Sequence, residues 1–229
     1  MDEAGVDIVL VGDSLGMVVL GFPDTTHVTL DHMLHHVEAT ARGVKNALLV
    51  GDMPIHSYDT VEQAVQSAKK LFLAGADAVK LEGGAAQAGN IRAIVEAGIP
   101  VVGHIGLLPQ KVLEEGGYKI KGKSSAEEEA LVRDVEAVAE AGACAVVVEG
   151  VTPHAARQVT VHSSIPTLGI GSGSHTCDGD VVVIHDLVGA FPWFIPAFVK
   201  PRADVAGSMT AAVKEWMEDC YTEPGSISS

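Results

Sequence analysis

The chain of 229 residues is long enough for one large domain, and no Ser/Pro/Gly-rich linker or break in composition divides it. Its 15 basic and 30 acidic residues give a net charge of −15 at pH 7, which makes nucleic acid and anionic membrane poor partners. Apolar residues make up 47% of the chain but aromatic residues only 4%, so Val, Ala, Leu and Ile must form the core, as in helix-covered parallel sheets.

Seven short apolar runs are predicted to be buried parallel strands. In chain order they are 7–13, 47–52, 78–82, 101–105, 145–149, 166–170 and 180–185. Four of these runs follow an amphipathic segment that ends in Ala-Gly, where the glycine suits the positive φ needed just after a helix. The four pairs are Ala4-Gly5, Ala74-Gly75, Ala97-Gly98 and Ala141-Gly142.

Three helix starts are also predicted. Thr29 is expected to cap a helix over Leu30 to Arg42, and Thr60 and Ser125 each begin a sequence typical of a capping box. The alternation of strand and helix predicts an α/β fold with a parallel sheet, in one barrel domain over residues 1–229. A closed (β/α)8 TIM-type barrel needs eight strands, and this sequence opens on the end of a helix. We therefore expect that the first strand and most of its helix are missing, or that the barrel closes in an unusual way.

Most of the predicted strands end in a polar residue. These residues are Asp13, Asp52, Lys80 with Glu82, His104 and Glu149. The carboxyl ends of barrel strands face one shared cavity, where catalytic residues collect. Carboxylates gathered there repel one another unless something compensates, and a hard divalent cation with oxygen ligands is the usual solution. The pattern therefore predicts an active site.

The remaining features concern the compartment. Cys144, Cys177 and Cys220 form no CxxC pair, so a disulfide framework or zinc site is not expected and a reducing compartment fits. The longest apolar stretch, Val181 to Val199, contains a His, an Asp and two prolines, which argues against a membrane helix. The N-terminus resembles neither a signal peptide nor a transit sequence. We expect a cytoplasmic location, or a mitochondrial one if a transit segment preceded Met1.

Several longer motifs extend over nearly the whole chain. They are VGDSLGMVVLGFPDTTHVTLDHMLHH (11–36), VGDMP (50–54), AVKLEGG (78–84), GHIGLLPQ (103–110), GYKIKGK (117–123), VVEGV (147–151), IPTLGIGSG (165–173), CDGDVVVIHDLVG (177–189) and FVKPRADV (198–205). With these motifs the chain resembles the ketopantoate hydroxymethyltransferase (3-methyl-2-oxobutanoate hydroxymethyltransferase) family, a barrel of the phosphoenolpyruvate/pyruvate superfamily. The chain departs from the family in lacking the first strand with its TAYD-like motif, in its Ile-Gly-Leu-Leu-Pro run at 105–109, and in its tail after Pro201.

The resemblance implies a one-carbon transferase of pantothenate and coenzyme A biosynthesis. Such an enzyme moves a hydroxymethyl group from 5,10-methylenetetrahydrofolate to 3-methyl-2-oxobutanoate, giving 2-dehydropantoate. The oxo acid loses its C3 proton, Mg²⁺ stabilises the resulting enolate, and the enolate attacks the folate methylene. The implied partners are this oxo acid, folate and further copies of the same chain in a homo-oligomer.

The resemblance also implies roles for the residues at the strand ends. Asp13 and Asp52 become magnesium ligands that also contact the bound substrate, with Glu82 close by, either directly or through a water. The alternative for each Asp is a helix N-cap. Ser14 is expected to hold the substrate carboxylate, and a capping serine is its alternative. Lys80 is expected to neutralise the oxo-acid oxygens; its alternative is a structural ion pair with Glu82, because residues two apart on a strand point the same way.

Glu149 is our candidate for the base at C3. It follows an Ala-Val-Val-Val run, where an uncompensated carboxylate is costly to bury, and apolar surroundings make a carboxylate a stronger base. His104 is placed near the incoming methylene, where it could transfer a proton or bond the product hydroxyl; a satisfied core histidine is the alternative. The basic loop Lys119 to Lys123 is a lid, a contact for the glutamate tail of folate, or a solvated loop.

Two other functions stay open from the sequence. One is a Mg-dependent 2-oxo-acid lyase of the isocitrate lyase type, which folate dependence would distinguish and whose usual catalytic cysteine motif is absent here. The other is a truncated, non-catalytic barrel that only binds or assembles, which cooperative melting would help to discriminate.

Overall fold

The structure, a computed structural model, describes residues 1–222. The chain comprises two compact units, residues 1–181 and residues 182–229. The first unit contains every predicted site residue. The single barrel domain over 1–229 stays a prediction.

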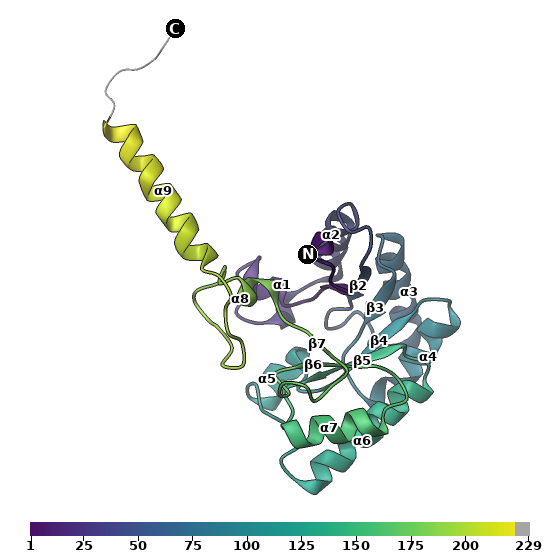
Figure 1. The fold of residues 1–229 in the computed structure, drawn as a ribbon. Coiled ribbons are helices and arrows are strands. Elements are labelled where there is room, and N and C mark those ends of the chain that lie inside the picture. Colours follow the sequence, from purple (N-terminus) through teal and green to yellow (C-terminus); the bar gives the residue numbers. More distant parts are fainter. Residues whose placement is uncertain (223–229) are drawn as a thin grey trace. The chain divides into compact units, whose positions relative to one another are not determined.

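A seven-stranded parallel sheet runs through the first unit (Figure 1). Its strands are β1 (Ile8–Val11), β2 (Leu48–Asp52), β3 (Ala78–Lys80), β4 (Val101–Gly106), β5 (Ala145–Glu149), β6 (Thr167–Ile170) and β7 (Gly179–Asp180). Each strand pairs with the next one along the chain, and the sheet curls into a half-barrel. The α/β fold with a parallel sheet is therefore confirmed. Among residues 1–222, β1 and β7 are the two edges of the sheet and do not pair with each other.

The seventh strand is the clearest departure from prediction. A strand over 180–185 was expected, but β7 covers only Gly179–Asp180, and Val181 adds one further hydrogen bond from its N–H to the Gly169 carbonyl (2.8 Å). Among residues 1–222 this edge strand has a hydrogen-bonded neighbour on one side only, β6, so the apolar run that follows gains little by staying extended. A helical turn begins at Ile184 instead. A short apolar run does not by itself distinguish a strand from a helix.

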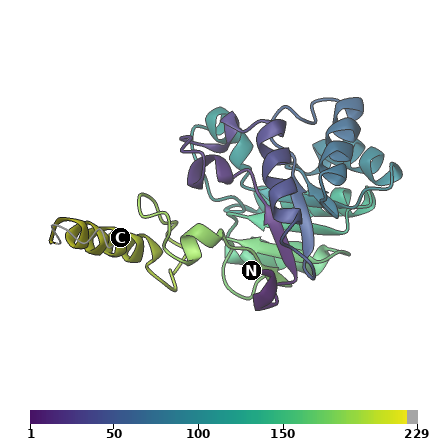
Figure 2. The ribbon, with the colours of Figure 1, turned by 90° about the horizontal axis from the view of Figure 1, so that it is seen from above.

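The helices connect the strands. In the first unit they are α1 (Leu15–Val18), α2 (Leu30–Ala41), α3 (Val61–Leu73), α4 (Ala88–Glu96), α5 (Val112–Glu115), α6 (Ser125–Glu140) and α7 (Pro153–His162), with 3-10 turns η1 (Asp2–Ala4), η2 (Thr25–His27), η3 (Ala85–Gln87) and η4 (Pro109–Lys111). The second unit contains α8 (Ile184–Leu187) and α9 (Val205–Thr222). The longer helices of the first unit, α2, α3, α4, α6 and α7, lie along the outer side of the curled sheet (Figures 1 and 2). No helix within residues 1–222 is both long and apolar enough to cross a membrane.

The predicted helix boundaries were mostly confirmed. The hydroxyl of Thr29 accepts the His32 N–H, and that of Thr60 accepts the Gln63 N–H. The prediction at Ser125 was wrong by one residue, because Ser124 caps α6 by accepting the Glu127 N–H. The chain carries two adjacent serines, and the same Ser-x-x-Glu spacing occurs one position earlier. The four glycines of the Ala-Gly repeat all have φ between 78° and 107°.

The two faces of the sheet carry different cores. The outer face packs against the helices through a large apolar cluster that includes Val9, Leu49 and Val79. The inner face carries a smaller cluster of Val50, Ala78, Val102, Ala145 and Val147. Because successive side chains on a strand alternate between faces, the inner face continues two residues further to Asp52, Lys80, His104 and Glu149. The polar group therefore sits directly above an apolar floor.

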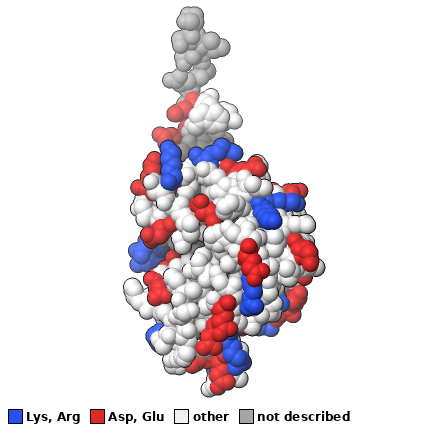
Figure 3. All heavy atoms as spheres, turned by 90° about the vertical axis from the view of Figure 1, so that its right-hand side faces the viewer, with Lys and Arg blue, Asp and Glu red and all other residues white. Residues whose placement is uncertain are grey.

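Charged side chains are scattered over the surface. On the face drawn in Figure 3, Lys and Arg side chains are interspersed with Asp and Glu side chains over a mostly uncharged surface.

Candidate active site

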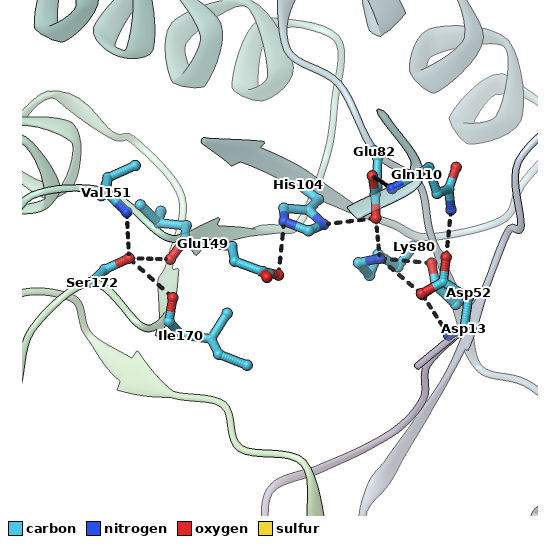
Figure 4. Close-up of polar contacts among 11 residues, drawn as sticks. Asp13, Asp52, Lys80, Glu82, His104, Gln110, Glu149, Val151, Ile170 and Ser172 are labelled. Carbon is cyan, nitrogen blue, oxygen red and sulfur yellow. Dashed lines mark hydrogen bonds and ion pairs between the residues drawn. The ribbon is translucent and has the colours of Figure 1, made fainter. Parts of the chain in front are cut away.

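Side chains from four adjacent strand ends and two loops meet at the carboxyl end of the sheet (Figure 4). Five of them are almost completely buried: Asp13, Asp52, Lys80, Glu82 and His104. Glu149 differs from these, because 23% of its side chain is exposed. The parallel register explains the gathering, since Asp52 on β2 lies opposite Lys80 on β3 and His104 on β4 lies opposite Val147 on β5.

Lys80 is the cation of the cluster. Its Nζ donates to both oxygens of Asp52 (2.8 and 2.9 Å) and lies 3.8 Å from Oε1 of Glu82. Burial lowers the pKa of Lys80, but the carboxylates of Asp52, Glu82 and Asp13 more than offset this and raise it above its usual range. Lys80 is therefore an ammonium whose main partner is Asp52, rather than Glu82 as the ion-pair alternative assumed.

Carboxyl groups outnumber cationic groups in this cluster, because Asp13, Asp52 and Glu82 are buried beside the single Lys80. Burial raises the pKa of Asp13 to about 7, with a further contribution from the nearby Asp52 carboxylate. Burial likewise raises the pKa of Glu82 well above its ordinary value, although Lys80 opposes the shift. The backbone N–H of Asp13 donates to Oδ2 of Asp52 (3.1 Å), and Oδ2 of Asp13 accepts from Nε2 of Gln110 (2.9 Å). The carboxylates of Asp13 and Asp52 thus make tertiary contacts, and the alternative interpretation had predicted local helix-capping bonds.

The donor set fits a hard divalent cation. Carboxylate oxygens are the ligands that such cations prefer, and Oε1 of Glu82 is buried without a hydrogen-bond partner among the described residues. No group of three or more His, Cys, Asp or Glu side chains within residues 1–222 is arranged to hold a metal ion by itself. Mg²⁺ commonly takes only one or two protein carboxylates and completes its shell with water and substrate oxygens.

His104 lies between two carboxylates. Its Nε2 is 3.4 Å from Oε2 of Glu149, and its Nδ1 is 3.7 Å from Oε1 of Glu82. Burial, reinforced by the positive charge of Lys80, lowers the pKa of His104 and favours the neutral imidazole. Both ring nitrogens are buried without a geometrically satisfactory hydrogen bond within residues 1–222, so His104 is not the satisfied core histidine of the alternative interpretation. Its ring can give or take a proton.

Two further features named in the sequence analysis adjoin the cluster: Ser14, next to Asp13, and the basic loop Lys119 to Lys123. Ser14 is the N-cap of α1, but its hydroxyl makes no capping hydrogen bond within residues 1–222. The basic loop is tied to the segment after Glu149, because the Lys121 N–H donates to the Gly150 carbonyl (2.9 Å) and the Thr152 N–H donates to the Lys121 carbonyl (3.0 Å). Nζ of Lys121 also pairs with the Glu115 carboxylate.

Comparison with known proteins identifies the family. Residues 1–224 match the family model described as ketopantoate hydroxymethyltransferase. The chain belongs to the ketopantoate hydroxymethyltransferase family.

Curated relatives agree with this assignment, and each is named 3-methyl-2-oxobutanoate hydroxymethyltransferase. The one from Ignicoccus hospitalis is 50% identical over 96% of this chain and 83% of its own length. The one from Moorella thermoacetica is 49% identical over 95% of this chain and 81% of its own. The one from Hyperthermus butylicus is 51% identical over 96% of this chain and 76% of its own.

Solved structures place the fold of this ketopantoate hydroxymethyltransferase family member more broadly. Phosphonopyruvate hydrolase matches with a TM-score of 0.62 at 15% identity, covering 96% of this chain and 89% of that one. The 2,3-dimethylmalate lyase, a PEP mutase/isocitrate lyase superfamily member, matches with a TM-score of 0.59 at 19% identity, covering 95% and 75%. At this level of identity the likeness concerns the fold alone.

Sequence reasoning gave no role to two buried polar residues of this family member, Gln110 and Tyr58. Gln110 donates to Asp13 and to the Met53 carbonyl, and the Tyr58 hydroxyl donates to the Gln110 amide oxygen. Burial and the nearby Glu82 raise the pKa of Tyr58 above its ordinary range, so its proton stays in place. One signal was visible at Gln110, a polar residue that ends an otherwise apolar turn, Leu107 to Pro109.

Gly106 offers a test of how closely β4 and β5 must approach in this family member. Its φ is 97°, and a Cβ at this position would lie 2.3 Å from the Glu149 carbonyl oxygen. Gly106→Ala is therefore expected to cost about 1–3 kcal/mol from backbone conformation alone, with a further cost from displacing the end of β5. Urea unfolding measures the loss. The control is Gly21→Ala, where φ is 76° but no atom lies within 4 Å of the added Cβ. Equal losses in the two variants would show that the contact with Glu149 is unimportant.

Proposed function

We propose that this chain transfers a hydroxymethyl group from 5,10-methylenetetrahydrofolate to 3-methyl-2-oxobutanoate, giving 2-dehydropantoate for pantothenate and coenzyme A biosynthesis. With one water consumed, the other product is tetrahydrofolate. The observation that carries the proposal is the match, at about 50% identity over 96% of the chain, to relatives named 3-methyl-2-oxobutanoate hydroxymethyltransferase. The cluster of carboxylates, lysine and histidine at the strand ends supports it chemically.

We assign Asp13 and Asp52 to a magnesium ion, with Glu82 contributing directly or through a water. When bound, Mg²⁺ would act as a Lewis acid that stabilises negative charge on the substrate's keto oxygen. The support for this assignment is the surplus of buried carboxylates over the single ammonium of Lys80. Lys80 would add its positive charge to the binding of the oxo-acid oxygens. The Ser14 hydroxyl, which makes no capping hydrogen bond to α1 within residues 1–222, would hold the substrate carboxylate together with the Ser14 N–H.

We assign the base at C3 to Glu149. Its carboxylate is the most exposed of the cluster, so a substrate can reach it, whereas Asp52 is held by Lys80 and Asp13 by Gln110. Removal of the C3 proton leaves its electron pair in the enolate. Water replaces the two C–N bonds of the folate methylene, which releases tetrahydrofolate and leaves the methylene carbon bonded to oxygen as an aldehyde. The enolate carbon bonds to that carbon, and the aldehyde oxygen takes up a proton to become the product hydroxyl. The neutral His104 ring, 3.4 Å from Glu149, can then take up or return the proton.

Finer features of the molecule are also proposals. The sheet edges β1 and β7 each have one strand neighbour among the described residues, and an eighth strand between them would complete a closed (β/α)8 barrel. A homo-oligomeric assembly and a cytoplasmic location follow from the family resemblance.

The decisive experiment is proton NMR of 3-methyl-2-oxobutanoate in D₂O with the purified chain. The C3 proton signal is expected to disappear with Mg²⁺ and to persist with EDTA, because the enolate needs a Lewis acid. Adding 5,10-methylenetetrahydrofolate is then expected to yield 2-dehydropantoate. Cleavage of a 2-oxo-acid bond without folate would indicate a lyase instead. No exchange from a chain that melts cooperatively would rule out the catalytic proposal.

A further inference from the structure

Gln110 connects two carboxylates that come from different strands. It lies in η4, the turn after β4, and is 3% exposed. Its backbone N–H donates to Oε2 of Glu82 (3.1 Å), and its side-chain Nε2 donates to Oδ2 of Asp13 (2.9 Å). One buried residue thus binds one oxygen of each carboxylate (Figure 4).

The orientation of the Gln110 amide is itself determined by two neighbours. Its Nε2 also donates to the Met53 carbonyl (3.0 Å), and the Tyr58 hydroxyl donates to its Oε1. If the amide were reversed, its oxygen would face the Met53 carbonyl, which can only accept, and Asp13 would lose its donor. Tyr58 is 8% exposed, so water does not readily replace its hydrogen bond. The amide therefore has one favourable orientation.

This arrangement determines which carboxylate oxygens stay available. The hydrogen bond from Gln110 occupies Oε2 of Glu82, and Oε1 is left buried without a hydrogen-bond partner among residues 1–222. At Asp13 the bond from Gln110 likewise occupies Oδ2. The Gln110 amide is neutral, so it orients both carboxyl groups without adding positive charge. A second lysine at this position would add positive charge.

We propose that Tyr58 and Gln110 are positioning residues, which orient Asp13 and Glu82 so that one oxygen of each is presented to a divalent cation. This proposal rests on the magnesium assignment in the proposed function. Neither residue acts on the substrate; each acts through the carboxylates. Substituting a residue that hydrogen-bonds to a metal ligand typically weakens metal binding by about 10- to 100-fold.

The test is a titration of the substrate-free chain with Mn²⁺, followed by electron paramagnetic resonance of the free ion. Tyr58→Phe keeps the ring and removes only the hydroxyl, and Gln110→Met keeps similar volume without the donors. Both variants are expected to bind Mn²⁺ at least about 10-fold more weakly. The controls are Tyr221→Phe, whose side chain is 81% exposed on α9, and Gln66→Met on the exposed side of α3; neither should change the affinity.

Thermal unfolding without metal separates positioning from stability. A lowered Tm with unchanged Mn²⁺ affinity in the folded protein would mean that the pair is only structural, and would overturn the proposal. If Gln110→Met does not fold, Tyr58→Phe decides alone. Unchanged affinity in variants of a chain that binds Mn²⁺ and exchanges the C3 proton would overturn the positioning role only. Failure of the unaltered chain to bind Mn²⁺ would overturn the magnesium assignment as well.

Discussion

Glu149→Gln is expected to lower both kcat and the rate of C3 proton exchange by about 10²- to 10⁴-fold, the range that a general base commonly contributes. Glutamine has the same shape as glutamate but cannot accept the proton. The fold should survive, because 23% of the Glu149 side chain is exposed and its nearest polar partner, His104, is neutral. We therefore expect the change in unfolding free energy to stay within about 1 kcal/mol.

The matched control for this prediction is Glu128→Gln. Glu128 also lies beside a histidine, since its Oε2 is 3.3 Å from Nε2 of His154, but this pair is on the surface between α6 and α7. The control variant should exchange the C3 proton at the rate of the unaltered chain. If Glu149→Gln kept full exchange while His104→Gln abolished it, the base would be His104, and our assignment would be wrong.

The arrangement of Lys80 and Glu82 shows how far the sequence leads. Their spacing of two residues on a predicted strand was enough to place them on one face, because strand side chains alternate. Which carboxylate Lys80 binds was a different matter. The answer depends on the register that places Lys80 opposite Asp52. The register between β2 and β3 could not be predicted from this one sequence.

The contacts of Gln110 mark the limit of local reasoning. Its partners Tyr58 and Asp13 are 52 and 97 residues away in sequence, and they meet it only because loops from neighbouring strand ends converge. No periodicity or spacing rule connects such positions. The C′ glycines, by contrast, were predictable because their conformation is set by the helix that each one follows. Features set by local sequence could thus be predicted, whereas hydrogen-bond partners distant in sequence could not.

The largest effect on stability is expected at Lys80. Lys80→Met would leave Asp52, which is 1% exposed, and the buried Glu82 without their ammonium partner. Leaving a buried charge unpaired typically costs about 3–5 kcal/mol, so we expect a loss of that size in the metal-free chain by urea unfolding at pH 8. The matched control is Lys121→Met, which removes the partly exposed pair with Glu115 and should cost about 1 kcal/mol or less.

A second substitution distinguishes the loss of charge pairing from the loss of packing. In the double variant Lys80→Met/Asp52→Asn the uncompensated carboxylate is gone, while an oxygen remains to accept the Asp13 N–H. If pairing is the cause, the double variant should be more stable than Lys80→Met, because removing both partners of a buried pair costs less than removing one. If the two variants are equally destabilised, the lysine contributes through its aliphatic packing, and Asp52 does not depend on it. With Asp52→Asn as the second single variant, the double-mutant cycle measures the coupling free energy between Lys80 and Asp52.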